Sequence, residues 1–425
     1  MLVQFDAKGR TANRKRRSVV LIKPFQALHP VSEDAKAVAC FPYDVAGDLE
    51  ARDFVSQNPF SFLRVTRPEV EFPESHSGEG EILTAGKRNL EGLVSSGLLV
   101  KDGEPSVYVY RLDTGTHSQT GVVACCSLDE YERGLVKKHE KTRPDKVAER
   151  TRHMVELRAQ TGLILVAFKF TEEIRKAIEQ TTLGTPIFEF ACGDGIKHSA
   201  WRVGEPKSII DAFARLDSLY IADGHHRIEA ALNARNILRD RNGSATGVAD
   251  YEYVMAGMFP SDELRILPYN RVVRDIGGIS ADDLFARIAE SFVISDTNEV
   301  PPKDHGDICM YFRGRWYLLH FNVAYDGQPD PIEQLDVTIL QKYLLAPVFG
   351  IGDPRTDERI GFVGGVRGTA ELERLVDSSE AAAAFALYPT RMSDLLSVSD
   401  MGEVMPPKST WFEPKLKDGL FVHLI

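Results

Sequence analysis

The sequence lacks any hydrophobic run long enough to cross a membrane. A spanning helix needs about 20 apolar residues, whereas the longest candidate, TGLILVAFKF, has the length of a buried strand. The basic segment from Lys8 to Arg17 precedes an apolar run, residues 18–22, that is too short for a signal-peptide core. We therefore expect no membrane association, and we expect residues 1–18 to form a solvated basic tail rather than a nucleic-acid-binding arm.

Cysteine is also scarce. The five cysteines are odd in number and form no CxxC pair, so neither a disulfide framework nor a typical zinc site is indicated. This pattern predicts a protein of the reducing cytoplasm whose thiols act mostly as small buried hydrophobic groups.

The chain also has fewer basic than acidic residues. The chain carries 51 basic and 62 acidic residues, which gives a net charge of −11. A protein that binds nucleic acid over a broad surface usually needs a basic face, so nucleic acid is an unlikely partner. A small phosphate pocket needs only a few local donors and is compatible with this charge.

No internal repeat or low-complexity segment divides the chain, and its length predicts several domains. The alternating segment SVYVYRLDTG and the following GVVACCSL predict a strand pair, whereas helix and strand patterns alternate after residue 136. We predict a multidomain α+β protein. Its parts are expected to be the tail (1–18), an N-terminal mixed domain (19–135), a central domain (136–265) and a C-terminal mixed domain (266–425) that closes on the site.

Several smaller features support this outline. The segment KKHEKTRPDKVAERTRHMVELRAQTG predicts a loop that enters a helix, which Gly162 ends, and LILVAFKF predicts a buried strand. Ser280 is a plausible N-cap for the next long helix of the C-terminal part, and Gly350 is expected to end the helix that begins near residue 335.

The strongest functional signal is the segment LYIADGHHRIEAAL. The apolar run LYIA predicts a strand that leads into a tight turn, and Gly224 permits a backbone conformation that other residues avoid. The helix that follows presents unpaired N–H groups and the positive end of its dipole, which together favour an anion. Asp223 is expected either to cap this helix or to hold Mg²⁺ between two phosphates.

Three side chains add donors at the same helix start. His225, His226 and Arg227 follow Gly224 directly, and an arginine can bind two phosphate oxygens at once. The alternative is an ordinary capped turn with surface histidines. A zinc pair is disfavoured, because adjacent helical positions face different directions and no HExxH pattern is present. We predict a phosphate site at this turn.

Several motifs together resemble a prokaryotic family known as domain of unknown function 1015. The resemblance covers almost the whole chain from about Phe25 onward. The motifs are FPYDV, NPFSFLRVTRPE, KKHEKTRP, ADGHHR, LPYNRVV and MPPKSTWFEPKLKDGL.

The ADGHHR turn also resembles that of the free serine kinases in the ParB/sulfiredoxin superfamily. This resemblance implies a ParB/sulfiredoxin-like central domain in which Asp223, Gly224, His225, His226 and Arg227 contact nucleotide phosphates. It also implies a catalytic glutamate earlier in the domain. Glu140 is the candidate because it precedes the helix and strand that lead toward the turn.

Two further clusters have both functional and structural interpretations. The segment His139 to Arg143 combines an acid with cations, as phosphoryl transfer requires, but it is equally consistent with a polar helix entrance. The proline-rich loop 405–415 offers Lys408 and Lys415 to phosphate and Trp411 to a base, with Lys408 the candidate nucleotide ligand. The alternative is a C-terminal clamp, and Phe412 is expected in the core.

Other single residues are less specific. Asp44 either caps its own turn or binds a substrate amine or metal, and Arg271 either contacts an anion or forms a buried ion pair. The glycine-rich run 361–368 lacks the lysine–serine ending of a phosphate-binding P-loop and predicts a tight strand turn.

The sequence therefore predicts a nucleotide-dependent kinase that acts on a small hydroxyl compound, with free serine as the first acceptor to test. The expected cofactor is Mg²⁺ with ADP or ATP, and the expected general base is Glu140. Asp44, Asp223 and Glu229 are the alternatives for the base. A ParB-like regulatory protein that binds nucleotide without turnover is the rival function, and a DNA-binding partition-like protein is disfavoured by the acidic charge and the lack of a clear helix-turn-helix.

Overall fold

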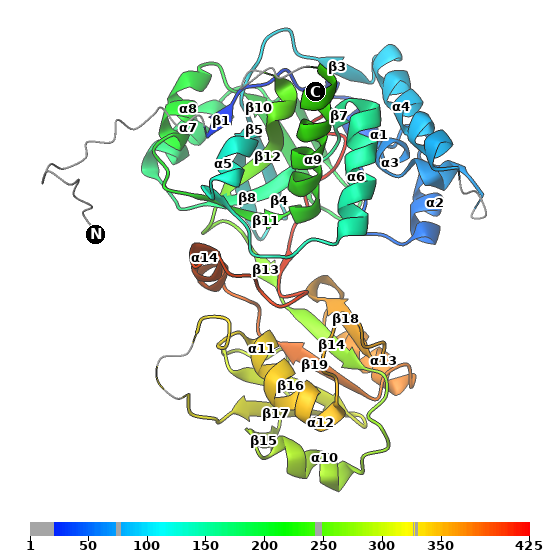
Figure 1. Ribbon diagram of the computed structural model, residues 1–425, viewed down its shortest axis with the longest axis vertical. Helices are drawn as coiled ribbons and strands as arrows, with labels where there is room; N and C mark the ends of the chain where they lie inside the picture. The colour runs from blue at the N-terminus through cyan, green and yellow to red at the C-terminus, as the bar shows by residue number, and fades with distance from the viewer. Residues whose placement is uncertain (1–20, 74–77, 243–248, 326, 328–329) are drawn as a thin grey trace, which may run out of the picture.

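The structure is a computed structural model that describes residues 21–425 except 74–77, 243–248, 326 and 328–329. The predicted basic tail, residues 1–18, lies outside the described residues. The described chain is a mixture of helices and strands arranged in an upper and a lower lobe (Figure 1).

The upper lobe is built on a nine-stranded sheet of order β6–β11–β8–β12–β5–β4–β10–β9, with β1 beside β5. β12 pairs parallel with β8 and antiparallel with β5. The strands are β1 (Ile22–Lys23), β4 (Tyr108–Asp113), β5 (Ser118–Ser127), β6 (Val136–Lys137), β8 (Ile164–Phe168), β9 (Phe188–Ala191), β10 (Lys197–Arg202), β11 (Leu219–Asp223) and β12 (Tyr253–Pro260).

Both faces of this sheet are buried, and successive residues of a strand face the two sides alternately. In β5, Val122 and Ala124 face one apolar core, whereas Val123 and Cys125 face the other. Helices cover the first face, and the C-terminal segment, including Phe421, covers the second. The helices are α5 (Leu128–Glu132), α7 (Glu172–Thr182), α8 (Pro206–Phe213) and α9 (His225–Asn242), and the 3₁₀ turn η2 (Asp250–Glu252) precedes β12.

A cluster of helices flanks the sheet on the right of Figure 1 and packs around its own apolar core. Short strands β2 (Leu28–Pro30) and β3 (Leu99–Lys101) pair beside it. The helices are α1 (Ala35–Val38), α2 (Asp48–Gln57), α3 (Leu63–Thr66), η1 (Pro68–Glu71), α4 (Glu79–Ser95) and α6 (Pro144–Leu157).

The lower lobe contains an antiparallel six-stranded sheet of order β15–β17–β16–β19–β14–β18. Its strands are β14 (Tyr269–Val273), β15 (Phe292–Asp296), β16 (Asp307–Phe312), β17 (Arg315–Phe321), β18 (Ile360–Gly364) and β19 (Ala383–Leu387). Its helical segments are α10 (Ala281–Ile288), α11 (Asp336–Leu340), the π-helical turn η3 (Gln341–Leu345), α12 (Ala346–Phe349), η4 (Gly365–Arg367) and α13 (Ala370–Asp377).

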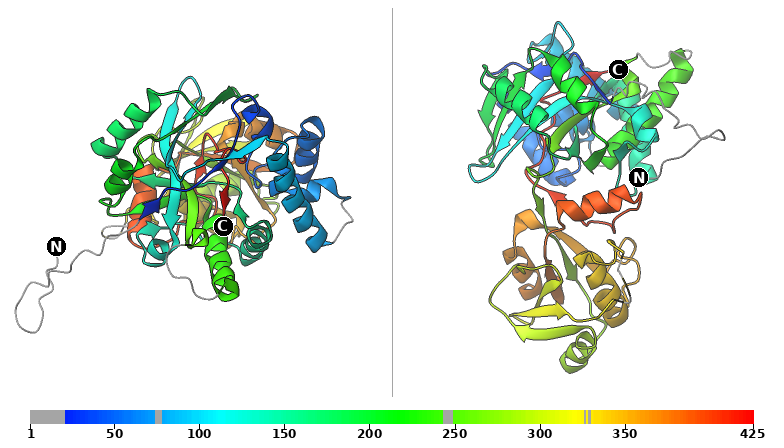
Figure 2. Two further views of the ribbon diagram at one scale, coloured as in Figure 1. Left: turned by 90° about the horizontal axis from the view of Figure 1, so that it is seen from above. Right: turned by 90° about the vertical axis from the view of Figure 1, so that its left-hand side faces the viewer.

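The chain leaves the lower lobe and returns to the upper one. After β19 it forms α14 (Met392–Asp400), which lies between the lobes (Figure 2). β20 (Trp411–Phe412) then pairs with β13 (Ile266–Leu267), where the chain first crossed. Finally β21 (His423–Leu424) pairs with β7 (Ala159–Gln160), so the C-terminus is fixed inside the upper lobe.

Many local predictions agree with this fold. β4 and β5 form the predicted antiparallel pair, the Ser280 hydroxyl caps α10, and Gly350 ends α12 with a φ of 66°. All five cysteines are free, and all but Cys192 are buried. No described helix is long and apolar enough to cross a membrane.

The predicted segment boundaries agree less well. α6 ends at Leu157, where Arg158 adopts a left-handed φ of 53°, rather than at Gly162. The upper sheet takes strands from both 19–135 and 136–265, so it does not divide at residue 135. Likewise, the end of the predicted domain 266–425 belongs to the upper lobe. Strand patterning shows where a strand lies but not which strand it pairs with.

We predict that Gly121→Ala destabilises the upper lobe. A Cβ atom at this position in β5 would lie 2.4 Å from the Met258 carbonyl oxygen and 2.6 Å from the Phe259 ring. The clash can be relieved only if the neighbouring backbone moves, and overpacking of this kind lowers the free energy of unfolding by about 1–3 kcal/mol. Urea denaturation measures the loss. Gly103→Ala is the control, since its Cβ would meet nothing within 4 Å, and equal stability of the two variants would contradict the prediction.

Candidate phosphate-binding site

The predicted strand–turn–helix segment is present, and glycine is required at its centre. β11 ends at Asp223, Gly224 has a φ of 93°, and α9 begins at His225. A side chain at Gly224 would be strained by this conformation and would also approach Ile164 of β8 to 3.0 Å. The turn therefore lies directly against the sheet and directs the start of α9 outward.

The start of α9 presents free backbone donors. The N–H groups of Arg227 and Ile228 donate to the Gly224 carbonyl, and the Gly224 N–H donates to the Asp223 carboxylate at 2.7 Å. Among the described residues, no acceptor takes the N–H groups of His225 and His226. Together with the helix dipole, these donors make the turn a favourable place for an anion.

Asp223 binds a lysine from the C-terminal loop. Its Oδ2 lies 2.7 Å from Lys415 Nζ, and its Oδ1 accepts the Gly224 N–H. Burial would raise the pKa of Asp223, but the charges of Lys415 and Arg227 outweigh it and hold that pKa below its usual range. Asp223 is therefore an ionised carboxylate. The bond to Gly224 closes the turn and takes no N–H group from inside α9, so Asp223 is not a conventional N-cap.

Three histidines surround the start of α9 and are held neutral. The His226 Nε2 accepts the Arg143 N–H at 3.0 Å, and the His225 Nε2 accepts the His139 N–H at 3.5 Å. Burial lowers the pKa of His225 and His226, and it lowers that of His139 to about 4, against the opposing effect of the Ile221 backbone. An imidazole whose Nε2 accepts carries its proton on Nδ1. His225 and His226 are therefore neutral Nδ1–H donors rather than cations.

Glu140 lies at the same turn, as its predicted role requires. Its Oε2 is 3.5 Å from the His225 Nδ1, and the carboxylate lines the same cavity as Asp223. Burial raises the pKa of Glu140, and the nearby Asp223 carboxylate adds to the shift while Lys408 opposes it. A carboxylate whose pKa is raised binds a proton more readily, which is the property of a general base.

The alternative carboxylates for the base are placed differently. Glu229 accepts hydrogen bonds from Tyr131 and from Lys138, and it does not line the cavity. Asp44 lines the cavity and has no ion pair or hydrogen bond with any described residue. Asp223 is occupied by Lys415.

Arg227 points toward partners of the upper lobe. Its guanidinium donates to the Leu163 carbonyl and lies 3.9 Å from Asp418. Gly162 makes room for this arrangement, since a Cβ there would lie 2.5 Å from Asp418 Oδ1 and 3.1 Å from Arg227 Nη1. Arg227 therefore lines the cavity while it is held by protein acceptors, and the phosphate grip expected of it stays a prediction.

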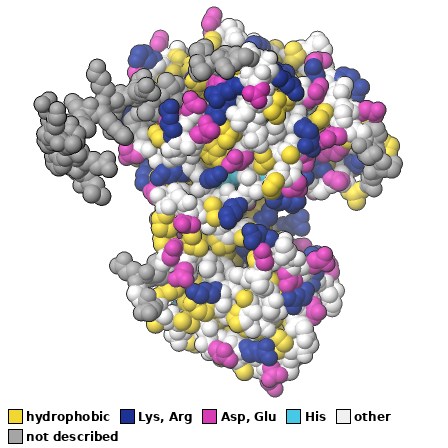
Figure 3. Space-filling model, in the orientation of Figure 1, with side chains coloured by type: hydrophobic (Ala, Val, Ile, Leu, Met, Phe, Trp, Pro, Cys, Tyr) yellow, Lys and Arg dark blue, Asp and Glu magenta, His cyan; other side chains and the backbone are white. Residues whose placement is uncertain are grey.

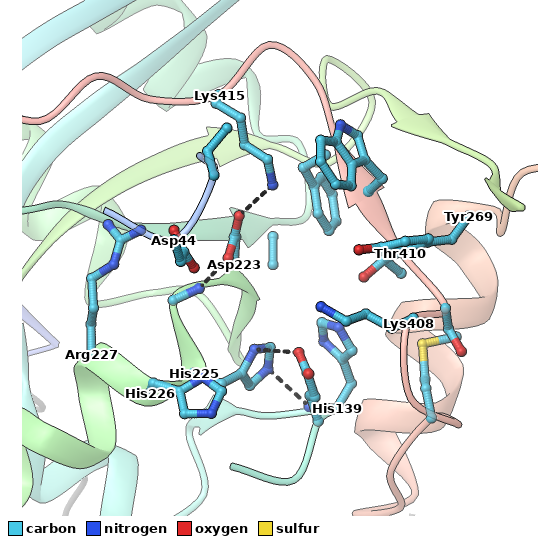
Figure 4. A pocket seen from close by; sticks show the side chains of 18 of the residues that line it. Asp44, His139, Asp223, His225, His226, Arg227, Tyr269, Lys408, Thr410 and Lys415 are labelled. Atoms are coloured by element: carbon cyan, nitrogen blue, oxygen red, sulfur yellow. Dashed lines mark hydrogen bonds and ion pairs between the residues drawn. The ribbon is translucent and has the colours of Figure 1, made fainter. Parts of the chain in front are cut away.

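The loop 405–415 closes the cavity from the other side (Figure 4). Lys408 adopts a left-handed φ of 56°, and its ammonium lies 5.5 Å from the centre of the Tyr269 ring. Phe412 is buried in the core, as predicted. Trp411 packs against Gly364 and edge-on to Tyr269, and its indole N–H donates to Glu413.

Arg271 forms no ion pair with a described residue, which contradicts one of its two interpretations. It is buried, and its guanidinium donates to the carbonyls of Tyr269 and Pro407 without a carboxylate partner among the described residues. Burial lowers its pKa to about 10. Arg271 thus ties β14 to the loop that carries Lys408. The glycines of 361–368 form the end of β18 and the turn η4, as predicted.

These residues enclose a cavity of about 160 Å³. Of the predicted site residues, it brings together Glu140, Asp223, Gly224, His225, His226, Arg227 and Lys408. It also contains His139, which is buried and whose ring nitrogens have no hydrogen-bond partner of good geometry among the described residues. In the sequence His139 stands out only as part of the polar cluster His139 to Arg143, because its neighbour Glu140 gives the stronger signal.

Comparison with known proteins identifies a family. The model of the family described as "Protein of unknown function (DUF1015)" matches residues 22–338, which is more than half of the chain. No curated protein matches the chain.

Solved structures show only a weak likeness. A free serine kinase in complex with AMP has a TM-score of 0.33 and 13% identity, with 68% of this chain and 86% of that chain covered. A conserved hypothetical protein from Pyrococcus furiosus has a TM-score of 0.33 and 13% identity, with coverages of 71% and 95%. SbnI with a C-terminal truncation from Staphylococcus aureus has a TM-score of 0.37 and 12% identity, with coverages of 71% and 87%. Likenesses this weak carry no argument about the chemistry of this chain.

We predict that Asp418 makes stability depend on pH. Burial raises the pKa of Asp418 to about 7, although Arg227 opposes the shift. Between pH about 4 and 7 the folded protein therefore holds a proton that the unfolded chain has lost. The contribution of Asp418 to the free energy of unfolding should fall across this window as pH rises, by up to about 1.4 kcal/mol per unit. The buried histidines, whose pKa values are lowered, act in the opposite direction below a pH of about 6.5. The contribution of Asp418 is therefore the difference between the wild type and Asp418→Asn.

Urea denaturation at pH 5 and pH 7 tests this prediction. The stability of the wild type relative to Asp418→Asn should be lower at pH 7 than at pH 5. The stability of the wild type relative to Asp240→Asn, at an exposed position, should be the same at both pH values. The same pH dependence in the wild type and in Asp418→Asn would show that Asp418 does not titrate in this range.

Proposed function

The chain belongs to the DUF1015 family of proteins of unknown function, and we propose that it is a nucleotide-dependent phosphotransferase acting on a small hydroxyl compound in the cytoplasm. Free serine is the first acceptor to test. One observation carries the proposal. Glu140, a carboxylate with a raised pKa, shares a small cavity with the unpaired donors of α9 and with two lysines.

The phosphates of the nucleotide are assigned to the start of α9. The free N–H groups of His225 and His226 supply uncharged donors there, while Lys408 and Lys415 supply positive charge from the opposite wall. Hydrogen bonds from charged donors to phosphate are short and strong. The neutral Nδ1–H group of His226 adds a donor without requiring a proton from solvent.

Glu140 is assigned as the general base. It takes the proton of the acceptor hydroxyl while the hydroxyl oxygen forms a bond to the terminal phosphorus, and the nucleotide leaves with one phosphate fewer. The Nδ1–H of His225 lies beside the carboxylate and orients it toward the cavity. Catalysis of this kind depends mainly on positioning and on neutralising charge around the phosphoryl group.

The carboxylates present fit a magnesium ion carried by the nucleotide. Mg²⁺ is usually held by one or two carboxylates together with phosphates and water, and Asp223 and Asp44 both line the cavity. Bound there, the ion would neutralise charge on the phosphates. The described residues contain no group of three or more metal-ligating side chains that could hold a metal by themselves, so Asp223 is proposed as a partial ligand.

The assignment of residues 136–265 as a ParB/sulfiredoxin-like domain is part of the same proposal. A thermal-shift screen with AMP, ADP, ATP and CTP, each with Mg²⁺, tests nucleotide binding, because a ligand bound only to the folded state raises the melting temperature. A phosphotransfer assay with the stabilising nucleotide and free serine then tests turnover. Binding without any product for a range of hydroxyl compounds would favour a regulatory protein instead.

We predict that Glu140→Gln lowers turnover about 10²–10⁴-fold, the usual contribution of a positioned base. The substitution keeps the size of the side chain and removes its basicity, so nucleotide affinity should change little. Steady-state kinetics and calorimetry measure the two quantities. Glu91→Gln, at an exposed position on α4, is the control. Full activity in Glu140→Gln would remove Glu140 from the mechanism.

We predict that Lys408→Met weakens nucleotide binding by about 1.5–3 kcal/mol, the scale of a hydrogen bond to a charged group. Lys408 is exposed and lines the cavity, and no described carboxylate lies within ion-pair distance of it, so its charge is available to a ligand. Titration calorimetry measures the change. Lys207→Met, at a highly exposed position away from the site, should leave affinity unchanged. An unaltered dissociation constant for Lys408→Met would place the phosphates elsewhere.

A further inference from the structure

A second and larger cavity adjoins the phosphate-binding site. This side groove has a volume of about 740 Å³ and lies between α6 on one side and η1 and α4 on the other. Four residues line both cavities, so the two are continuous there. The shared residues are Tyr43, Asp44, His226 and Lys408.

The two cavities differ in volume, so they can hold ligands of different size. Sites for drug-sized ligands and cofactors measure roughly 300–1,000 Å³. The first cavity, at about 160 Å³, has room for phosphate groups and a small acceptor but not for a nucleoside as well. The side groove has the volume that a nucleoside requires. Figure 3 shows a hollow at the waist of the molecule with lysine and arginine side chains at its edge.

The walls of the side groove combine apolar and polar surface. Ile82, Leu83 and Pro68 offer apolar contact to a flat ring, while Glu69 and Glu79 offer carboxylate oxygens. Apart from Lys408, the arginines and lysines of the groove are each paired with a carboxylate. Arg67, for example, is paired with Asp48 and Glu69. Such a surface suits an uncharged ligand with hydroxyl groups better than another phosphate.

The junction between the cavities has one distinctive group. Asp44 has no ion pair or hydrogen bond with a described residue, although Lys408 and His226 line the same junction. A free carboxylate would repel phosphate but readily accepts hydrogen bonds from hydroxyl groups, as acidic residues do toward ribose in other nucleotide sites. In a nucleotide, the ribose lies between the phosphates and the base.

We infer that the side groove holds the nucleoside of the nucleotide, with the base against Ile82 and Leu83 and the ribose at Asp44. This assignment rests on the proposed function, because it takes the phosphates to lie at the start of α9. The phosphate chain then passes His226 and Lys408. The acceptor hydroxyl is left to the first cavity, beside Glu140.

The test compares pyrophosphate with ADP, each with Mg²⁺, by titration calorimetry on the full chain. In the wild type, ADP should bind roughly tenfold or more tightly than pyrophosphate, since only ADP gains contacts in the side groove. Leu83→Trp fills the groove, so it should weaken ADP binding about tenfold and leave pyrophosphate binding within about twofold. Thr84→Trp is the matched control, because Thr84 is exposed on the same helix and lines neither cavity.

Ile82→Trp provides a second variant if Leu83→Trp does not fold, as circular dichroism will show. Wild-type affinities that are equal for ADP and pyrophosphate would overturn the assignment, as would ADP binding that neither groove variant weakens. A groove variant that retains ADP affinity but loses activity with the acceptor would place the acceptor in the side groove instead. Failure of both pyrophosphate and ADP to bind would reject the proposed function itself.

Discussion

The return of the C-terminal segment to the DGHHR turn is the constraint on which the site depends. Two ionisable residues of the turn each lie beside an ionisable residue of this segment. Asp223 pairs with Lys415, and Arg227 lies 3.9 Å from Asp418. The backbone of Asp418 also exchanges hydrogen bonds with Cys40. These contacts fix the loop that carries Lys408 across the start of α9, and without them the cavity would lack one wall.

Burial gives this arrangement its chemistry. The same desolvation that raises the pKa values of Glu140 and Asp418 lowers those of His139, His225 and His226. The histidines therefore act as neutral hydrogen-bonding groups, and the positive charge of the site comes from lysine and arginine. Because fixed charges interact more strongly where water is excluded, the placement of each acid and base matters more here than the net charge of −11.

The parts of the site that could be predicted from the sequence are those that local chemistry determines. The turn at Asp223–Arg227 is predicted by its own residues, without reference to the rest of the chain. These are a short apolar strand, a glycine and the polar start of a helix. Ser280 and Gly350 were predictable for the same reason, since caps and helix ends depend on a few adjacent residues. Glu140 is indicated only by the resemblance, and the structure places its Oε2 3.5 Å from the His225 Nδ1.

What could not be predicted depends on contacts between distant residues. Asp223 and Lys415 are 192 positions apart, and no periodicity or motif couples them. The single upper sheet was missed for the same reason, because β12 joins β8 to β5 across the expected boundary at residue 135. Arg271 admitted two interpretations, and neither included backbone carbonyls as its partners.

The ion pair between Asp223 and Lys415 bears directly on the proposed chemistry. The pair is partly buried, with the two side chains 22% and 34% exposed, and a charge left without its partner in such a cavity is costly. A phosphate at the start of α9 would give Lys415 a new anionic partner. Asp223 would then be free to bind a cation that accompanies the phosphate. Anion and cation must then enter together, because either one alone would leave Asp223 or Lys415 without compensation. Under the proposed function, the turn would therefore accept a nucleotide together with its metal ion rather than a bare phosphate.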